Sequence, residues 1–339
     1  MKKNFKNILI FGHSNIGDVC YDGAVVGPLR QEFPGARISF ITSARAQAVA
    51  SAISGIDEVI VFDKQAAHKG FPGYLKFILY IRRRKFDAAV ILRGHMHHFF
   101  GIPVSVAHLK NTSSDDAEHV AWQHIRLLER IGIKDATPHF NFSFSEEEKE
   151  FARKYLNPAK EVNPPYSVGI MPFSAWKLKC WPVEKWNEII DFLSVGFGAA
   201  VFVLGKTDGH PFEKDFMRKI SPKAVSLVDK CGLRQSLAVI KELDLFIGTD
   251  TSLLHFASCM AVPCIGLFGP SNHKVFHPFF HRGLMIISQA AMPCIPCFNA
   301  KEVGYCGVKD APGPCMMDIS TEHVREKINL ALKNRSRCG

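Results

Sequence analysis

A polar loop at residues 12–18, Gly-His-Ser-Asn-Ile-Gly-Asp, directly follows the apolar run 8–11. The loop lacks both the Gly-Lys-Ser/Thr of a Walker A loop and the Gly-x-Gly-x-x-Gly of a dinucleotide-binding turn. It ends in Asp18, where a helix is predicted to begin. Asp18 is either a first-turn acid favoured by the helix dipole or a general base facing a ligand cleft.

A second polar segment, 172–182, has the sequence Pro-Phe-Ser-Ala-Trp-Lys-Leu-Lys-Cys-Trp-Pro and follows another apolar run. Lysines on such a loop can reach a diphosphate as point charges, and Ser174 can donate a hydrogen bond to it. Ordinary surface charge is the alternative for the lysines. Trp181 and Pro182 are typical of a structural anchor followed by the first residue of a helix.

The third segment, 244–255, gives the strongest indication, because an apolar run passes through Gly248 into a cluster of Thr, Asp and Ser. A helix predicted to start there would offer unpaired amides and a positive dipole end to a pyrophosphate. The side chains placed at this anion site are Asp250, Thr251, Ser252 and His255. His255 is four residues after Thr251 and so lies on the same helix face, as a ligand contact or as a half-buried structural histidine.

Further polar residues follow other predicted strands. Asp208 and Glu213 flank the loop after 200–204, and either could bind the ribose hydroxyls of a nucleotide, although solvated loop acids are common. The histidines of 95–98 follow the run 88–92 without an acid at metal-ligand spacing, which favours contacts to a substrate or surface histidines over a metal site. The candidate substrate contacts in these two loops are His13, Asn15, Arg93 and His95.

Nine of the ten cysteines come after residue 179. Four of them, with the spacing C-x2-C-x8-C-x8-C, are Cys294, Cys297, Cys306 and Cys315. Four thiolates could form a closed, structural zinc or iron site, although the second half of the pattern lacks the paired spacing of a zinc ribbon. The alternative is a set of reduced thiols, because no export signal favours disulfides.

The composition indicates a folded protein with two cores. A chain of 339 residues exceeds one ordinary α/β domain, and 47% of its residues are hydrophobic. The net charge of +10 suits phosphate-bearing partners, with ordinary solvation as the alternative, and no aromatic interleaving indicates nucleic-acid binding. The apolar run 8–11 is too short for a signal peptide or a membrane span, which predicts a cytoplasmic protein.

Short β-type runs alternate with helical patterns along both halves, which predicts parallel sheets with crossover helices. The predicted strands are 7–11, 37–42, 58–62, 88–92, 167–171, 200–204, 224–228, 245–248 and 264–268. The predicted helices are 19–33, 44–51, 74–83, 119–131, 183–193, 212–220, 233–243, 252–260 and 321–333. Three prolines within 157–165 predict the linker between two doubly wound α/β domains, whose strand ends are the expected ligand edges.

Four blocks together resemble glycosyltransferase family 9, the ADP-heptose:lipopolysaccharide heptosyltransferases and their relatives. These blocks are Ser-Asn-Ile-Gly-Asp at 14–18, Lys-Cys-Trp-Pro at 179–182, Gly-Thr-Asp-Thr-Ser-Leu-Leu-His at 248–255 and Gly-Leu-Phe-Gly-Pro-Ser at 266–271. The resemblance implies a GT-B fold, with two Rossmann-like doubly wound domains facing each other across a cleft. The expected divisions are an acceptor-binding domain at 1–160, a nucleotide-sugar-binding domain at 161–320 and a C-terminal helix and tail at 321–339.

The resemblance also implies an inverting transfer of heptose from ADP-heptose to a lipopolysaccharide inner-core or related acceptor, without a catalytic cofactor. Asp18 takes the position of the base and Lys179 that of the lysine that neutralises the leaving diphosphate. The implied donor contacts are Ser174, Glu213, Asp250, Thr251, Ser252 and His255, with serine at 252 where the family often has glycine. The implied partners are a phosphorylated glycolipid and the inner face of the cytoplasmic membrane, where the protein would be peripheral.

Other functions remain open at this point. The chain could be a non-catalytic relative that only binds a nucleotide sugar, or a family member with another donor or a protein acceptor. A nucleotide-dependent oxidoreductase is disfavoured by the missing glycine fingerprint.

Overall fold

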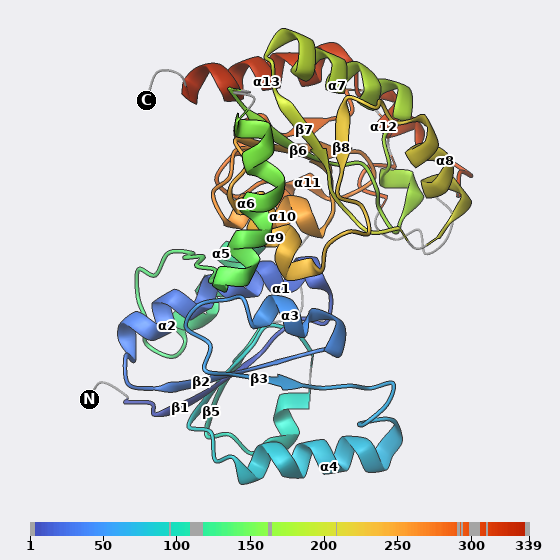
Figure 1. Ribbon diagram of the computed structural model, residues 1–339. Helices are drawn as coiled ribbons and strands as arrows, with labels where there is room; N and C mark the ends of the chain where they lie inside the picture. Colours follow the sequence, from blue (N-terminus) through green and yellow to red (C-terminus); the bar gives the residue numbers. More distant parts are fainter. Residues whose placement is uncertain are drawn as a thin grey trace. The chain divides into compact units, whose positions relative to one another are not determined.

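The computed structural model describes residues 4–94, 96–108, 118–161, 165–207, 209–289, 292, 294–297, 306–309 and 311–335. The chain folds into two compact units, Met1–Ser143 and Phe144–Gly339. Each unit contains one parallel sheet with helices on both faces (Figure 1). None of the helices in the described ranges combines the length and the apolarity needed to cross a membrane.

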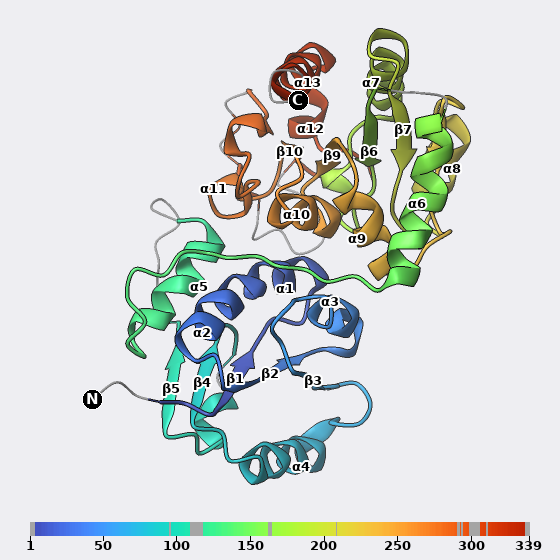
Figure 2. The same cartoon turned by 60° about the vertical axis from the view of Figure 1, so that its left-hand side comes forward.

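The sheet of the first unit has the strand order β3-β2-β1-β4-β5, and all its neighbouring strands are parallel. Its strands are β1 (Asn7–Phe11), β2 (Arg37–Thr42), β3 (Glu58–Val61), β4 (Ala88–Ile91) and β5 (Val104–Ala107). Its helices are α1 (Ile16–Asp22), α2 (Val26–Glu32), α3 (Gln47–Ala50), α4 (Gly70–Arg83) and α5 (Val120–Glu129). Helix α4 covers one face of the sheet, and the other four cover the opposite face (Figures 1 and 2).

Apolar residues on both faces of the central strands explain why this sheet lies between two helical layers. Ile8, Leu9 and Ile10 of β1 are fully buried. Continuous burial of this kind is typical of a parallel strand, whereas alternation would indicate one solvated face. On the α4 side, Phe77 and Ile81 of the helix pack into a core with residues of β1, β2, β3 and β4.

The second unit contains a six-stranded sheet in the order β11-β10-β9-β6-β7-β8, with parallel neighbours throughout. Its strands are β6 (Ser167–Met171), β7 (Ala200–Val203), β8 (Ala224–Ser226), β9 (Leu245–Thr249), β10 (Cys264–Phe268) and β11 (Ile286–Ile287). Its helices are α6 (Glu146–Glu161), α7 (Val183–Gly196), α8 (Pro211–Lys219), α9 (Leu233–Lys241), α10 (Ser252–Cys259), α11 (His273–Phe276), α12 (Pro314–Asp318) and α13 (Thr321–Arg335).

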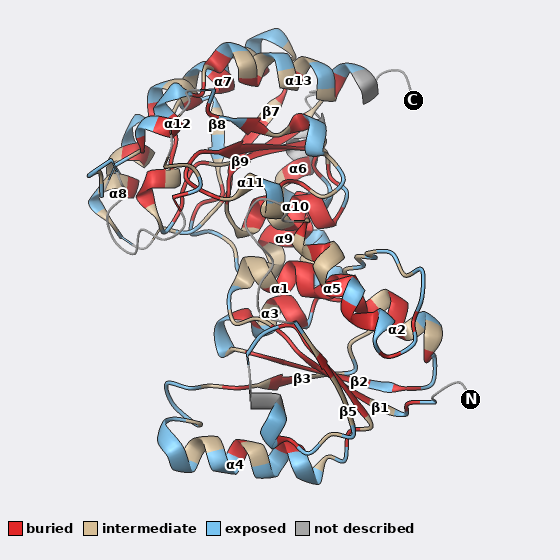
Figure 3. Ribbon diagram, turned by 180° about the vertical axis from the view of Figure 1, so that it is seen from behind, coloured by how far each residue is buried: buried red, intermediate tan, exposed pale blue. Residues whose placement is uncertain are grey.

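The core of the second unit is built around two tryptophans. Trp181 and Trp186 are fully buried and meet edge to face with ring centroids 5.3 Å apart. Their cluster includes apolar residues of β6, α7 and α13, and the strands and the inner faces of these helices are buried (Figure 3). The C-terminal helix α13 is therefore part of this core, as its predicted apolar face indicated.

The predicted strands were confirmed to within one or two residues at each end, while β5 and the two-residue β11 were missed. The predicted helix 19–33 is broken into α1, α2 and an intervening 3-10 turn, Gly23–Val25.

The predicted linker at 157–165 was wrong, because α6 runs through Pro158 to Glu161. Helix α6 packs against α9 of the same unit, and Glu148 pairs there with Arg234. These contacts place α6 in the second unit, so the boundary falls after Ser143 rather than after residue 160.

Candidate active site

In each unit the polar loops identified from the sequence follow the two strands at which the strand order reverses. These are β1 and β4 in the first unit and β6 and β9 in the second. In open parallel sheets, ligands bind at the carboxyl ends of strands at such a switch point. Each unit therefore has one candidate ligand edge.

The loop after β1 is held tightly by β2. The Gly12 N–H donates to Ile41 O at 2.9 Å, and the Thr42 hydroxyl donates to His13 O at 2.6 Å. The backbone also passes too close to its neighbours for a side chain at residue 12, since a Cβ there would lie 2.2 Å from Cζ of Phe40. The loop therefore presents the start of α1 in a fixed orientation.

Asp18 lies in the first turn of α1, at the position predicted for the base, and its side chain is 33% exposed. Asn15 donates from Nδ2 to Asp18 Oδ2 at 2.9 Å, and Arg93, after β4, has a guanidinium nitrogen 4.0 Å from the same oxygen. Asn15 makes no side-chain cap of the helix. A carboxylate that is accessible and oriented in this way can accept a proton from a bound hydroxyl.

Behind this loop, Asp22 joins two histidines that the chain brings from separate elements. Asp22 Oδ1 is 2.7 Å from Nδ1 of His13 and 3.4 Å from Nε2 of His124. Burial of Asp22 opposes its ionisation, but the two imidazoles outweigh burial and hold the pKa of its carboxyl far below 3.8. Burial lowers the pKa of His13, but Asp22 outweighs it and raises that pKa above 6.5.

At the ligand edge of the second unit, Lys179 and Asp250 form an ion pair. Lys179 Nζ lies 2.6 Å from Asp250 Oδ2, and His255 Nε2 lies 3.1 Å from the other carboxylate oxygen. Burial of Asp250 raises its pKa, but Lys179 and then His255 outweigh this effect and hold the pKa far below 3.8. The structure thus brings the predicted catalytic Lys179 together with two of the residues predicted to bind a donor, Asp250 and His255, in a cluster that is mostly buried.

Several hydroxyls at this edge have no partner within the described chain. The buried Oγ1 of Thr249, Oγ1 of Thr251 and Oγ of Ser271 lack a hydrogen bond. Thr249 ends β9, Thr251 precedes the first residue of α10, Ser252, and Ser271 follows the neighbouring strand β10. Buried hydroxyls are normally satisfied, so this group indicates the place of a ligand rich in oxygen.

Ser174 and Glu213 take part in a different set of contacts from the one expected of ligand residues. Ser174 Oγ accepts from the Trp176 amide at 3.2 Å, and its carbonyl accepts from Lys177 Nζ at 3.1 Å. Lys177 also forms a buried ion pair with Glu213, whose exposed fraction is only 2%. Glu213, on helix α8, therefore holds the segment that contains Lys177 against that helix in this conformation.

The remaining predicted site residues include two that lie outside the described residues, His95 and Asp208. The four cysteines are free thiols, and within the described ranges no three of their sulfurs gather closely enough to share an ion. The group of three potential ligands that the described residues do contain is His13, Asp22 and His124.

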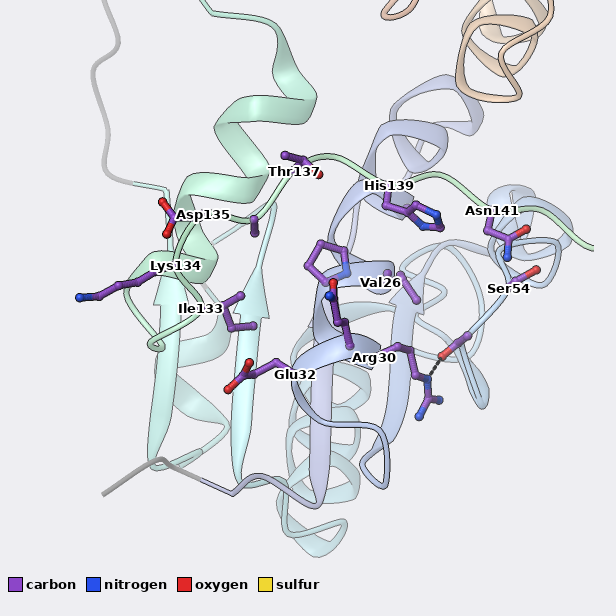
Figure 4. Close-up of a pocket in the computed structure, with 16 residues that line it drawn as sticks. Val26, Arg30, Glu32, Ser54, Ile133, Lys134, Asp135, Thr137, His139 and Asn141 are labelled. Carbon is purple, nitrogen blue, oxygen red and sulfur yellow. Dashed lines mark hydrogen bonds between the residues drawn. The ribbon is translucent and has the colours of Figure 1, made fainter.

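A separate hollow of about 710 Å³ lies in the first unit, between α2 and the segment 133–141 (Figure 4). Its lining includes Arg30, which is engaged by the carbonyl of Gly55 at 2.8 Å. Asp18 and Arg93 are not part of this lining. The hollow is thus distinct from the predicted ligand edge.

Sequence reasoning missed Lys177, Thr249, Ser271, Asp22 and His124. Ser271 could have been found, because it follows the apolar strand β10 in the same way as Asp250 follows the apolar strand β9. The two strands are neighbours in the sheet. The Lys177–Glu213 and Asp22–His124 contacts join residues far apart in the chain, which no local spacing indicates. Their partners emerge only when the helices pack on the sheets.

Two doubly wound parallel sheets, each with polar side chains at its switch point, agree with the GT-B fold of glycosyltransferases. Residues 81–305 match glycosyltransferase family 9 (heptosyltransferase). The chain belongs to this family.

Individual relatives agree with this assignment. The lipopolysaccharide core heptosyltransferase OpsX of Haemophilus influenzae is 23% identical over 289 residues, which cover 79% of this chain and 80% of OpsX. The crystal structure of a family 9 glycosyltransferase from Veillonella parvula superposes with a TM-score of 0.82 at 20% identity, covering 98% of this chain and 99% of that one. The Escherichia coli ADP-heptose heptosyltransferase II structure gives 0.74 at 18% identity, with 97% and 99% coverage. These structural similarities confirm the predicted fold.

Proposed function

We propose that this chain transfers a heptose from ADP-heptose to an inner-core lipopolysaccharide acceptor or a related surface glycan, with inversion at the anomeric carbon. The observation that carries the proposal is the Lys179–Asp250 pair beside the unsatisfied hydroxyls of Thr249, Thr251 and Ser271. A diphosphate offers the acceptor oxygens that these hydroxyls lack and the negative charge that the ammonium stabilises.

The N-terminal amides of α10 support the same placement of the diphosphate. Thr251 is the N-cap residue of this helix but makes no side-chain cap, so the first amides are not capped by its hydroxyl. Amides at a helix start bind phosphate oxygens and favour negative charge. The donor contacts proposed here are Ser174, Glu213, Asp250, Thr251, Ser252 and His255, with Glu213 acting on the ribose only if Lys177 releases it.

In the proposed reaction, an acceptor hydroxyl attacks the anomeric carbon while the bond from that carbon to the diphosphate oxygen breaks. Asp18 takes the proton of the attacking hydroxyl, and ADP leaves with the electron pair of the broken bond. Lys179 and the α10 amides stabilise the charge that develops on the diphosphate. These groups supply the stabilisation without a catalytic metal or other cofactor.

The proposed acceptor site is at the first unit's switch point. Arg93 is 52% exposed and His13 carries a raised pKa, so both can offer positive charge to an anionic acceptor. Asn15 orients Asp18 and is close enough to contact the same substrate. The proposed acceptor residues are His13, Asn15, Arg93 and His95.

We also propose that the protein works in the cytoplasm at the inner face of the membrane, and that α4 makes the contact. Phe71, Leu75 and Leu79 recur every four residues on one face of α4 and are 80%, 44% and 43% exposed. The opposite face of α4 is buried, since Phe77 and Ile81 pack against the sheet. Residues 64–85 contain seven Lys and Arg and no Asp or Glu. An apolar stripe among cations is typical of a helix at an anionic lipid surface.

Vesicle sedimentation tests the membrane contact. The protein should sediment with vesicles containing phosphatidylglycerol, less with phosphatidylcholine alone, and less at high salt. Replacing Phe71, Leu75 and Leu79 by serine should abolish the binding, whereas Val195→Ser, at a 76% exposed residue of the second unit, should not change it. Equal binding by the triple variant would refute this role of α4.

A structural zinc or iron ion at Cys294, Cys297, Cys306 and Cys315 is a further proposal. Its support is the C-x2-C-x8-C-x8-C spacing of these four cysteines. Burial raises the pKa of Cys315 to about 11, so a metal would have to displace its proton. Elemental analysis of the purified protein, compared with Cys297→Ser, tests this proposal.

The donor assignment is tested by a thermal-shift screen of nucleotide sugars. ADP-heptose should stabilise the protein by about 2.7 kcal/mol at a hundredfold excess over Kd. A larger shift with UDP- or GDP-sugars would overturn the assignment. Transfer assays with Asp18→Asn then separate an enzyme from a non-catalytic binder, because loss of the base should lower turnover about 10²–10⁴-fold while donor binding persists.

A further inference from the structure

The cluster of His13, Asp22 and His124 in the first unit has no role in the proposed transfer chemistry beyond the positive charge of His13. One ligand atom from each residue lies within 4.8 Å of the other two. Asp22 and His124 are 0% and 2% exposed, and His13 is 17% exposed. The three come from the end of α1, from α5 and from the loop after β1.

An ion pair between Asp22 and His13 does not account for the whole cluster. Nε2 of His124 is buried, faces Asp22 Oδ1 at 3.4 Å, and makes no hydrogen bond within the described chain. A buried ring nitrogen whose polar contact is this long is poorly satisfied, which is costly. A metal ion shared with Asp22 and His13 would satisfy it.

Two further atoms of these side chains, on His124 and Asp22, are already held by outer contacts. Nδ1 of His124 lies 3.1 Å from Nε2 of His108, and Asp22 Oδ2 accepts the His13 amide N–H at 2.7 Å. Ligating histidines and carboxylates in metal sites are oriented in this way through the atoms that do not touch the metal. The cluster therefore has both potential ligands and the contacts that fix them.

We propose that His13, Asp22 and His124 bind one divalent transition-metal ion of the zinc class. Two imidazoles and one carboxylate are a common ligand set for Zn²⁺, with the remaining position open to water on the partly exposed His13 side. The ion ties the loop after β1 and the end of α1, the helix that carries Asp18, to helix α5. Its role is positional, and no bond of the proposed glycosyl transfer is made or broken on it.

Metal binding and the existing hydrogen bond compete for the same ring nitrogen. Nδ1 of His13 meets Asp22 Oδ1 at 2.7 Å, so the proton between them must leave before both atoms can bind an ion. In neutral His13 this proton moves to Nε2, and in protonated His13 it is released to the buffer. The measured binding enthalpy therefore depends on the ionisation enthalpy of the buffer only where His13 starts as the cation.

The test is calorimetric titration of the chelator-treated, full-length protein with Zn²⁺, and optical titration with Co²⁺. To remove competing thiols, both use the Cys294→Ser/Cys297→Ser background. The wild-type cluster should saturate near one equivalent, and Co²⁺ should give visible ligand-field bands. His108→Gln should weaken binding by about 10–100-fold, as expected for loss of an outer contact. Asp22→Asn and His124→Gln should weaken it further, whereas His68→Gln, elsewhere in the same unit, should leave it unchanged.

Absence of saturable binding in this background would overturn the proposal, as would binding that Asp22→Asn and His124→Gln leave intact. If Asp22→Asn does not fold, the metal titration of His124→Gln decides whether the cluster is the binding site. Circular dichroism without metal checks that His124→Gln itself is folded. Thermal shifts with ADP-heptose are measured on the same proteins. Failure of the metal site and failure of the donor assignment are therefore separate results.

Discussion

Lys179 Nζ lies 2.6 Å from Asp250 Oδ2, at the carboxyl ends of the adjacent strands β6 and β9. The pair joins two segments that are 71 residues apart in the chain. The Asp250 side chain is only 5% exposed, and the ammonium keeps it ionised. Lys179 thus serves the fold by compensating a buried charge, and in the proposed reaction it also faces the leaving diphosphate.

We predict that Lys179→Met lowers turnover about 10²–10³-fold and weakens donor binding, because the charge developing on the diphosphate loses its cation. The variant should also lose about 1–3 kcal/mol of unfolding free energy, since the buried Asp250 oxygen loses its ammonium donor while His255 remains beside the carboxylate. Transfer assays and urea denaturation measure the two effects. Lys223→Met is the matched control, because its pair with Asp191 is about half exposed and should contribute less than about 1 kcal/mol.

The double variant Lys179→Met/Asp250→Asn separates these two roles. Removing the buried charge together with its partner should restore most of the lost stability, whereas turnover should stay low. If the double variant regains turnover as well, Lys179 acts only through Asp250. The proposed contact with the diphosphate would then be wrong.

The His13–Asp22 pair predicts a pH dependence for the stability of the first unit. His13 has a raised pKa in the folded protein. Its contribution to the free energy of unfolding is therefore fully present below pH 6.5 and is lost as the pH rises through the higher pKa of the folded state. Asp22 has a lowered pKa, so its contribution is present above 3.8 and is lost as the pH falls below that value. His124 also faces Asp22, and Asp18 and Arg93 act on His13.

The His13–Asp22 pair should therefore stabilise the folded protein most between about pH 4 and 6.5, and its stabilising effect should decline above neutrality. Urea denaturation at a series of pH values, in the presence of chelator, measures it. Asp22→Asn should flatten the difference between pH 6 and pH 8. An identical pH profile in the variant would assign the dependence to other groups.

Gly12 gives a steric prediction at the loop that positions Asp18. A Cβ at residue 12 would lie 2.2 Å from the Phe40 ring and 2.8 Å from Asp22 Oδ2, so Gly12→Ala must displace the ring or the loop. Overpacking of this kind costs about 1–3 kcal/mol. Turnover should fall more than donor binding, because the displaced group is the proposed base. Gly35→Ala is the control, since a Cβ there meets nothing within 4 Å, and an equal loss in both variants would contradict the steric argument.

The sequence predicted best those features that depend on neighbouring residues. The strands and the polar loops after them are local patterns, so the order of residue types alone placed Asp18, Lys179 and Asp250 at strand ends. The linker was predicted wrongly, because Pro158 was taken to exclude a helix that tertiary packing of α6 on α9 maintains. The partners of Lys177 and His124 depend on how helices pack on the sheets, which no spacing in the sequence records.

Trp181 anchors the segment that carries Lys179, and its two kinds of contact give different predictions. Its indole N–H donates to Ile319 O at 3.1 Å, and its ring is fully buried against Trp186. The Ile319 carbonyl also accepts from Lys185 Nζ at 2.7 Å, so it keeps a partner when the indole N–H is lost. We therefore expect Trp181→Phe to cost only about 1–2 kcal/mol, because no buried group is left unsatisfied.

Trp181→Ala removes the ring itself and should cost about 3–5 kcal/mol of unfolding free energy. Donor affinity should be nearly unchanged in Trp181→Phe, since the Asp250 carboxylate still fixes the Lys179 ammonium. Urea midpoints and nucleotide-sugar titrations of both variants measure these effects. If the phenylalanine variant is as unstable as the alanine variant, the hydrogen bond rather than the volume of the ring anchors the loop, and the Lys185 contact does not compensate for its loss.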